Sequence, residues 1–353
     1  MGSRRGYLLG LSQGLGVLLV LCVVIVIFSL KSPYFLTTSN FVTNMGSQDA
    51  ELGIIALGMA VVIASGGIDL SVGAILGLSA GVLGGVYDHG VGLVPGILIC
   101  LCVGLACGLV NGLLVELLQL HPLLVTLGTL ALYRGLALGI SNAGAYSTFP
   151  HGFLDIGGST LWGTVPDQLI PWLVIGIVIY LVTSRTPAGR KLIAVGINEK
   201  AAALSGVRVG AVRIAVYGTS GLLAAVAGVI YSSRVFSARG DAGSGLELLA
   251  ITAVVVGGAS IHGGELSVPR TTLGVILIGV IPNGFVLSNI DTSWQYVAVG
   301  TVMIVAVLVN ELLREGGLAR LHALVGRILG RDPEEERSGA PDETDVQTRT
   351  ANA

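Results

Sequence analysis

Residues 66–73, which read GGIDLSVG, place one carboxylate between two long apolar runs. A short acidic side chain ahead of a helix can accept hydrogen bonds from the free N–H groups of the first turn, where the helix dipole also favours negative charge. The flanking glycines permit the tight turn that this arrangement needs. We therefore expect Asp69 to cap the helix that follows. The alternative is a functional carboxylate on a substrate or gating surface, and the two roles are compatible.

The apolar runs belong to a chain whose composition suits lipid. Of its 353 residues, 53% are hydrophobic and only 11% are charged, against roughly 25% charged in a soluble domain. Several runs reach the length of about 18 residues that a membrane helix requires. We therefore expect an all-α membrane protein. Glycines spaced by four residues, at Gly104, Gly108 and Gly112, would form one stripe along a helix and allow close packing.

Hydropathy predicts one transmembrane domain, residues 1–313, with about ten membrane segments. These segments are 8–30, 47–64, 70–87, 92–117, 122–140, 167–183, 213–232, 247–258, 271–287 and 294–313. Lysine and arginine concentrate in the loops on the side of the N-terminus, which predicts that both termini are cytoplasmic. Beyond Arg331 the chain is polar, acidic and free of aromatic residues. Residues 314–353 are therefore expected to form a cytoplasmic and largely disordered tail.

The sequence resembles itself at an offset of 172 residues. At this offset Asp69 falls on Asp241, and the Asn-Gly pair at 111–112 falls on the pair at 283–284. The offset moves the chain by five segments, from segments 2–5 onto segments 7–10. Because five is odd, the two copies must cross the membrane in opposite senses. Such an inverted repeat is typical of transport proteins, whose pathway lies between the two halves.

Five blocks of sequence are more specific than these patterns. They read ASGGIDLSVGAILGLSA, LVTLGTLALYRGLALGI, GRKLIAVGINEKAAALSGV, AVVVGGASIHGG and SWQYVAVGTVMIVAVLV. In this order and spacing, over roughly residues 10–313, they resemble bacterial ABC-importer permeases of the ribose, xylose and galactose type. The resemblance implies a type II importer fold of about ten helices, with two permease subunits, identical or related, around a central path. It also implies two cytoplasmic ATPase subunits and an extracytoplasmic sugar-binding protein as partners.

The predicted cytoplasmic loop 184–213 carries six basic residues. Within it, residues 198–206, NEKAAALSG, predict a short helix that ends at glycine. The stretch is similar to the permease coupling loop, which inserts into a cleft on the ATPase, and the positions that would make this contact are Glu199, Ala201, Ala202, Leu204 and Gly206. Lys200 stands where a glutamate is usual, with Glu199 one place earlier, which puts a carboxylate role there in doubt. The alternative is a solvated basic loop.

The chain has no G-x-x-x-x-G-K-[ST] phosphate loop. We therefore expect a transport subunit that is not an enzyme and holds no cofactor of its own, with ATP bound by the partner ATPase. The four cysteines and five histidines show neither disulfide nor metal-ligand spacing.

Polar residues inside the apolar segments are candidates for the translocation path or its gate. Arg134 lies within a predicted span, where a charge is costly unless it faces the protein interior, and the resemblance agrees, since an arginine in this block is usual. Asn111 and Asn283 are paired by the repeat, and Asp69 completes this set. Snorkelling to the interface is the alternative for Arg134, and hydrogen bonding between helices is the alternative for the asparagines.

Arg234 and Arg239 interrupt the charge bias because they fall in a predicted external loop. Acidic residues on the docked binding protein would explain them, and pairing with Asp241 or Glu247 is the alternative. The external loop 141–166 carries four aromatic residues that are expected to anchor at the membrane interface. These are Tyr146, Phe149, Phe153 and Trp162.

The sequence thus predicts the permease subunit of an ATP-driven monosaccharide importer in the bacterial plasma membrane. Its expected partners are ATPase subunits, a sugar-binding protein, a second permease subunit and the lipid bilayer, and not nucleic acid. The first alternative keeps this mechanism with a nucleoside, an autoinducer-type sugar or a branched-chain amino acid as substrate. The second is an ion-coupled secondary transporter.

Overall fold

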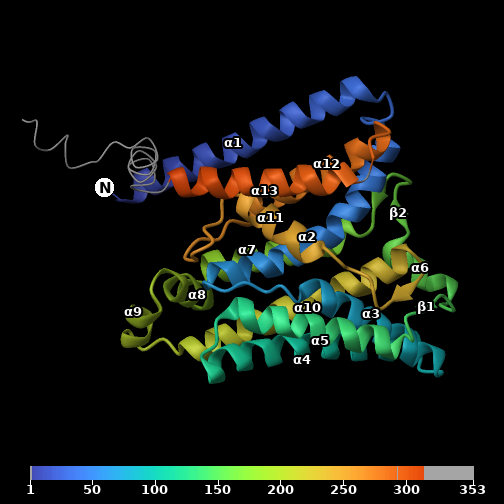
Figure 1. The fold of residues 1–353 in the computed structure, drawn as a ribbon, viewed down its shortest axis with the longest axis horizontal. Helices are drawn as coiled ribbons and strands as arrows, with labels where there is room; N and C mark the ends of the chain where they lie inside the picture. The colour runs from blue at the N-terminus through green and yellow to red at the C-terminus, as the bar shows by residue number, and fades with distance from the viewer. Residues whose placement is uncertain (1, 292, 314–353) are drawn as a thin grey trace, which may run out of the picture. The chain divides into compact units, whose positions relative to one another are not determined.

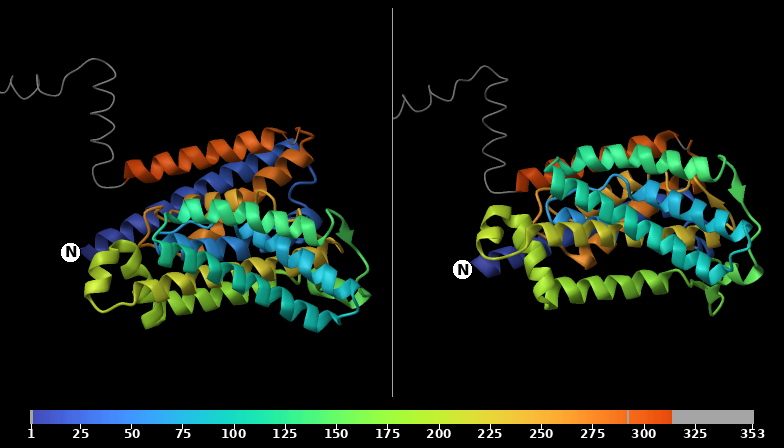
Figure 2. Two further views of the ribbon diagram at one scale, coloured as in Figure 1. Left: turned by 60° about the horizontal axis from the view of Figure 1, so that its bottom comes forward. Right: turned by 90° about the horizontal axis from the view of Figure 1, so that it is seen from below.

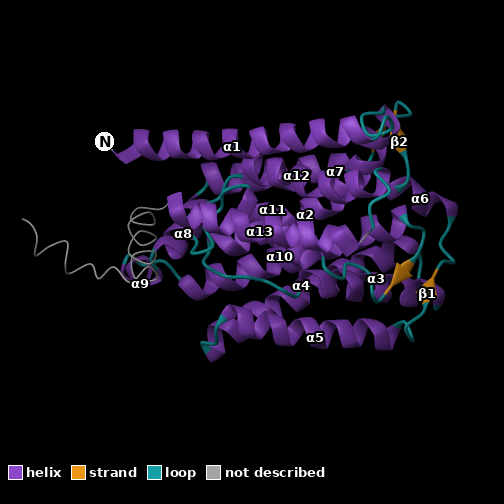
Figure 3. Ribbon diagram, turned by 45° about the horizontal axis from the view of Figure 1, so that its top comes forward, coloured by secondary structure: helices purple, strands orange, loops and turns teal. Residues whose placement is uncertain are grey.

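The computed structural model describes residues 2–291 and 293–313. This part of the chain is almost entirely helical, and its strands form only two short antiparallel pairs (Figure 3). The chain divides into a unit of residues 1–304 and a second unit of residues 305–353, and the description below concerns the first. The predicted tail, residues 314–353, lies outside the described residues.

Each of the ten predicted segments is a helix with ends within a few residues of those expected. These helices are α1 (Gly2–Lys31), α2 (Met45–Ala64), α3 (Val72–Asp88), α4 (Leu93–Leu118), α5 (Pro122–Ile140), α7 (Leu169–Arg185), α10 (Val209–Arg234), α11 (Leu246–Val256), α12 (Val268–Leu287) and α13 (Ser293–Leu313). Long apolar runs determine these positions locally, which is why the sequence predicts them.

Fewer than ten of these helices are long enough to span a bilayer. Among the described residues, six helices are long and apolar enough, and α7 together with α8 (Pro187–Ile197), bent by 75°, makes a seventh. The apolar helices α3 and α11 are shorter, as is the apolar stretch Ser293–Leu308 of α13. At 1.5 Å a residue, the 11 residues of α11 cover about 16 Å of a hydrocarbon core that is about 30 Å thick. The structure therefore shows a multi-pass membrane protein with six to seven candidate spans.

Helix α2 lies at the centre of the packing. It contacts α7, α10, α11 and α12, and 89% of its span is buried, against 11% for α1. Helix α10 contacts α2, α3 and α4, while α5 packs on α3 and α1 packs on α12. Figures 1 and 2 show α9 (Glu199–Leu204) at one end of this bundle and β1 (Ala145–Tyr146) at the other. We call these the α9 end and the β1 end.

The glycine stripe of α4 packs as expected. Gly104 faces Gly221 and Ala225 of α10, and a Cβ at Gly112 would lie 2.7 Å from the Cα of Ile214. Gly108 between them meets the backbone of Tyr217. No side chain fits between the two backbones at these points, so α4 and α10 approach each other as closely as small residues allow.

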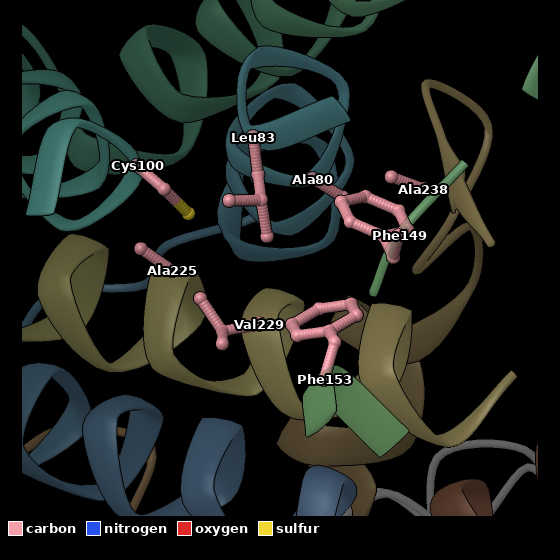
Figure 4. Close-up of a cluster of buried hydrophobic side chains, with 8 residues drawn as sticks. All are labelled: Ala80, Leu83, Cys100, Phe149, Phe153, Ala225, Val229 and Ala238. Atoms are coloured by element: carbon pink, nitrogen blue, oxygen red, sulfur yellow. The ribbon is translucent and has the colours of Figure 1, made fainter. Parts of the chain in front are cut away.

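The segment 141–166 has more structure than the loop that was predicted. It contains α6 (His151–Gly157) and β2 (Thr160–Leu161), which pairs with β3 (Val165–Pro166), while β1 pairs with β4 (Ala238–Arg239). The interfacial prediction is wrong for Phe149 and Phe153. Their ring centroids lie 4.5 Å apart in a buried cluster with Leu83 and Val229 (Figure 4), because α6 packs against α10.

Candidate translocation and coupling sites

Residues 66–73 form the turn between α2 and α3. Gly66 has φ +84°, a conformation that favours glycine, and α3 begins at Val72. The fully buried Asp69 accepts hydrogen bonds through Oδ1 from the backbone N–H of Ser71 at 3.0 Å and from its hydroxyl at 2.7 Å. Asp69 therefore organises the start of α3, although Ser71 rather than Asp69 is the N-cap residue.

The same carboxylate joins α3 to helices that lie far away in the sequence. Oδ2 of Asp69 accepts a hydrogen bond from Ser220 of α10 at 3.0 Å. Asn111 of α4 donates to Ser71 Oγ at 2.7 Å, and the hydroxyl of Tyr133 on α5 lies 3.2 Å from Asn111 Oδ1. Asp69 and Asn111, both predicted path residues, thus belong to one buried polar network that connects four helices.

Arg134 lies apart from this network and supports the β1 end. Its Nη1 donates to the carbonyls of Gly240 and Ala242 at 2.8 and 2.7 Å. Both carbonyls lie between β4 and α11. The side chain is half-buried, so Arg134 faces protein and fixes the backbone of this connection. These are the contacts expected of an interior-facing arginine.

Arg234 and Arg239 line a cavity of about 580 Å³ at the same end, together with Ala242. Arg234 binds the buried Glu51 of α2 through two hydrogen bonds of 2.7 and 3.0 Å. Arg239 likewise binds Asp241 through two hydrogen bonds, both of 2.8 Å, and this pair is half-exposed. Arg239 holds the pKa of the Asp241 carboxyl below its ordinary value through this hydrogen-bonded contact.

Two predicted site residues, Arg234 and Arg239, therefore meet around one cavity, which we call the β1-end cavity, and Arg134 holds the carbonyl of Ala242 in its wall. Docking of a binding protein is not needed to explain the charges of Arg234 and Arg239, since each arginine has an acidic partner within the chain. The pairing alternative describes Arg239 correctly. It names the wrong acid for Arg234, because Glu51 lies 183 residues away in sequence and nothing in the local pattern indicates it.

Asn283 lies neither in the Asp69 network nor at the β1-end cavity. It forms a reciprocal amide pair with Asn40 of η1 (Ser39–Asn44), with both bonds at 2.9 Å. Asn40 also donates to the carbonyl of Phe35. The two repeat-paired asparagines, Asn111 and Asn283, thus hold different contacts, and the four predicted path residues do not form a single site.

The coupling segment forms a bent arm at the α9 end. Asn198 caps α9 by accepting from the N–H of Ala201 at 3.0 Å, and Gly206, with φ +82°, follows the helix end. Ala201, Leu204 and Gly206 are exposed, and Leu204 is 91% exposed. Ala202, in contrast, is buried against its own chain. Only part of the predicted coupling set is therefore accessible to another protein.

Two residues that contact this arm or support it, Arg213 and Glu116, were not identified as site residues from the sequence. Arg213 of α10 lies 2.7 Å from Glu199 and 2.6 Å from Glu116 at the end of α4. One guanidinium thus ties α9 to two long helices. The basic loop pattern includes Arg213, but the 97 residues that separate it from Glu116 hide the contact from local analysis.

Comparisons with known proteins identify the family of the chain. The profile of the family described as branched-chain amino acid transport system / permease component matches residues 42–307. The ribose import permease protein of Bacillus subtilis (strain 168) is 38% identical over 311 residues, which cover 88% of this chain and 96% of that protein. The D-allose transport system permease protein of Escherichia coli (strain K12) is 36% identical, over 84% and 91% of the two chains.

A third relative is named for a different substrate. The autoinducer 2 import system permease protein of Photorhabdus laumondii is 33% identical over 321 residues, 87% of this chain and 92% of that protein. No solved structure matches the chain.

Proposed function

Because the chain belongs to the family of branched-chain amino acid transport system permease components, we propose that it is the membrane permease subunit of an ATP-driven importer. The match along nearly the whole length of a ribose import permease carries this proposal. As a permease component the chain is not an enzyme. The free energy for transport comes from a separate ATPase, with an extracytoplasmic binding protein to deliver the solute.

The proposed substrate is a monosaccharide of the ribose, xylose or galactose kind. The relatives named for ribose and allose support it. The relatives named for autoinducer 2 import favour a second candidate, an autoinducer-type sugar. Nucleosides and branched-chain amino acids remain alternatives with the same mechanism.

The proposed architecture is a type II importer fold with ten membrane segments, an inverted repeat and a second permease subunit. The packing supports the repeat. Helix α10 contacts α3 and α4, and α2 contacts α11 and α12. An offset of 172 residues relates α2 to α10, α3 to α11 and α4 to α12, so the two sets of contacts correspond. Helix α10 of the second half would then pack within the first half, and helix α2 of the first half would pack within the second.

The α9 end is proposed to be cytoplasmic, with both chain termini, and to dock on the ATPase. Exposed Ala201, Leu204 and Gly206 would form the contact. Buried Ala202 would support α9 from within, and Glu199 would act through its ion pair with Arg213 rather than by touching the ATPase. Closure of the ATPase would then pull on α4 and α10 together, because Arg213 holds both Glu199 and Glu116.

The β1 end is proposed to be the outer mouth, where the binding protein docks. Arg239 and Asp241 are exposed and would register the docked partner. Arg234 would shape the cavity beneath them through Glu51. Its volume of about 580 Å³ lies within the range of about 300–1,000 Å³ that is usual for small-molecule sites. Asp69 and Asn111 would act as a gate between helices, and Arg134 and Asn283 would hold neighbouring segments in position.

Reconstitution tests the proposal directly. Proteoliposomes that contain the permease, its ATPase and its binding protein should take up labelled ribose or allose only when ATP is supplied. Uptake that follows a proton or sodium gradient without the ATPase would instead identify a secondary transporter. ATP-dependent uptake of autoinducer 2 in preference to both sugars would select the second candidate.

A further inference from the structure

A groove of about 760 Å³ lies along the side of the bundle, between α7, α8 and α10. Six of its lining residues follow one face of α10 from its N-cap residue onward: Arg208, Ala211, Val212, Ala215, Val216 and Thr219. The spacing of three and four residues is that of a continuous helical stripe. From Arg208 to Thr219 this stripe runs about 16 Å, close to the depth of one leaflet of the hydrocarbon core.

The groove is apolar along its length and positively charged at one end. Its charged lining residues are Lys191 of α8 and Arg208, and none of its lining residues is acidic. Both cations are exposed, and among the described residues neither side chain has a hydrogen bond or an ion pair. Two acids of this end, Glu116 and Glu199, are bound to Arg213, and Glu265 does not line the groove. The positive charge of the groove is therefore not compensated within the described chain.

The bend between α7 and α8 shapes this groove. The two helices meet at 75°, with Thr186 as the N-cap of α8 and Pro187 in its first turn. A Cβ at Gly189 would collide with the backbone of Thr183, so α8 is held close against the end of α7. This contact holds α8, and with it Lys191, at the groove that Arg208 also lines, and α8 would lie near the membrane surface.

We propose that this groove binds an anionic phospholipid, with one acyl chain along α10 and the phosphate between Lys191 and Arg208. The observations that carry it are the uncompensated pair of cations, the apolar stripe and the match between the length of the stripe and one leaflet. Basic pockets between membrane helices bind anionic headgroups in this way. A free phosphate would leave the apolar length of the groove unused, and an acidic protein segment would have to bury its polar backbone there.

The test uses the full-length chain in mild detergent, titrated with phosphatidylglycerol or phosphatidylcholine of identical acyl chains, with bound lipid counted by native mass spectrometry. Phosphatidylglycerol should bind more tightly than phosphatidylcholine. Lys191→Gln and Arg208→Gln should each weaken phosphatidylglycerol binding roughly fivefold, and together about thirtyfold, as expected for removal of basic residues at a lipid surface. Lys191→Arg should retain binding because it keeps the charge.

Arg190→Gln is the matched control, since Arg190 is exposed on α8 but does not line the groove. It should leave lipid binding unchanged. Ala215→Trp, at an exposed position of the stripe, should fill the groove and weaken the binding of both lipids. A monodisperse profile in size exclusion for every variant separates loss of binding from misfolding.

Three results would overturn the proposal. One is equal retention of phosphatidylglycerol by wild type and the double variant. Another is an equal loss in Arg190→Gln, which would indicate a diffuse basic surface. The third is competition by inorganic phosphate, which would show that the cations bind a free anion rather than a lipid. None of these results depends on which solute the protein transports.

Discussion

Ser220 donates a hydrogen bond of 3.0 Å to the buried carboxylate of Asp69, which precedes it by 151 residues. Because Asp69 also organises the first turn of α3, this single bond ties the start of one helix to the middle of α10. A buried carboxylate depends on each of its donors, since the interior offers no water to replace one that is lost.

Ser220→Ala should therefore lower stability by about 1–3 kcal/mol, as expected when a buried charged acceptor loses a donor. Thermal unfolding of the purified protein measures this change. Thr301→Ala is the control, because within the part of the chain that the structure describes the exposed Thr301 side chain bonds only to Val297 of its own helix. If both variants unfold at the wild-type temperature, Asp69 does not depend on Ser220.

Leu204→Asp and Ala202→Asp should fail in different ways. Leu204 is 91% exposed and Ala202 only 4%. A carboxylate at Leu204 should leave folding intact and reduce ATPase binding and uptake by tenfold or more, on the order of the loss at a binding hot spot. A carboxylate at Ala202 buries a charge and should reduce the yield of folded protein. Two measurements distinguish the variants: the amount of ATPase that co-purifies with the protein and the yield of the protein in the membrane. Normal uptake by Leu204→Asp would refute the coupling contact.

Arg213→Gln should uncouple ATP hydrolysis from transport. Without the guanidinium, Glu199 of α9 and Glu116 of α4 lose the group that joins them at 2.7 and 2.6 Å. ATP should still be hydrolysed by the assembled complex, but more ATP should be consumed for each solute molecule imported. The measurement is the ratio of phosphate released to solute taken up. Arg190→Gln provides the control, and an unchanged ratio in Arg213→Gln contradicts the role.

Exchanging the charges of Arg239 and Asp241 isolates the docking role. The double variant Arg239→Asp with Asp241→Arg keeps an ion pair at this exposed site but inverts its direction. Stability should change little, because exposed pairs contribute about 0–1 kcal/mol. Uptake that depends on the binding protein should fall, and more steeply at low salt. Arg234 is unsuitable for this test, since an acid there would face the buried Glu51. Wild-type uptake by the exchanged variant would exclude docking through this pair.

Acid should affect the Arg239–Asp241 pair below the ordinary carboxyl pKa. Arg239 lowers the pKa of Asp241, so the contribution of the pair is present above the ordinary carboxyl pKa and is lost as the pH falls through the depressed value. In Arg239→Gln the acid limb of binding-protein association should therefore move to higher pH. Association measured across a pH series compares the two proteins, and coincident profiles would show that Asp241 has no part in docking.

Local features of the site were predictable. The turn at residues 66–73, the short helix before Gly206 and the stripe of Gly104, Gly108 and Gly112 follow from backbone freedom, capping and helical spacing, which act within a few residues. The misplaced aromatics show the limit of such reasoning. Phe149 and Phe153 look like surface anchors in a loop, yet α6 carries Phe153 into the protein and Phe149, just before α6, packs beside it.

The sequence by itself determined that this is a helical membrane protein, where its ten apolar helices lie along the chain, and to which family it belongs, because apolar length and ordered motifs are properties of the linear chain. Only the tertiary structure decided which polar groups far apart in the sequence meet. Glu51 reaches Arg234 across 183 residues and Asp69 reaches Ser220 across 151, while Arg134 and Asn283 go to separate places. These pairings depend on how whole helices pack, and packing is set by the shapes of surfaces that no local pattern records.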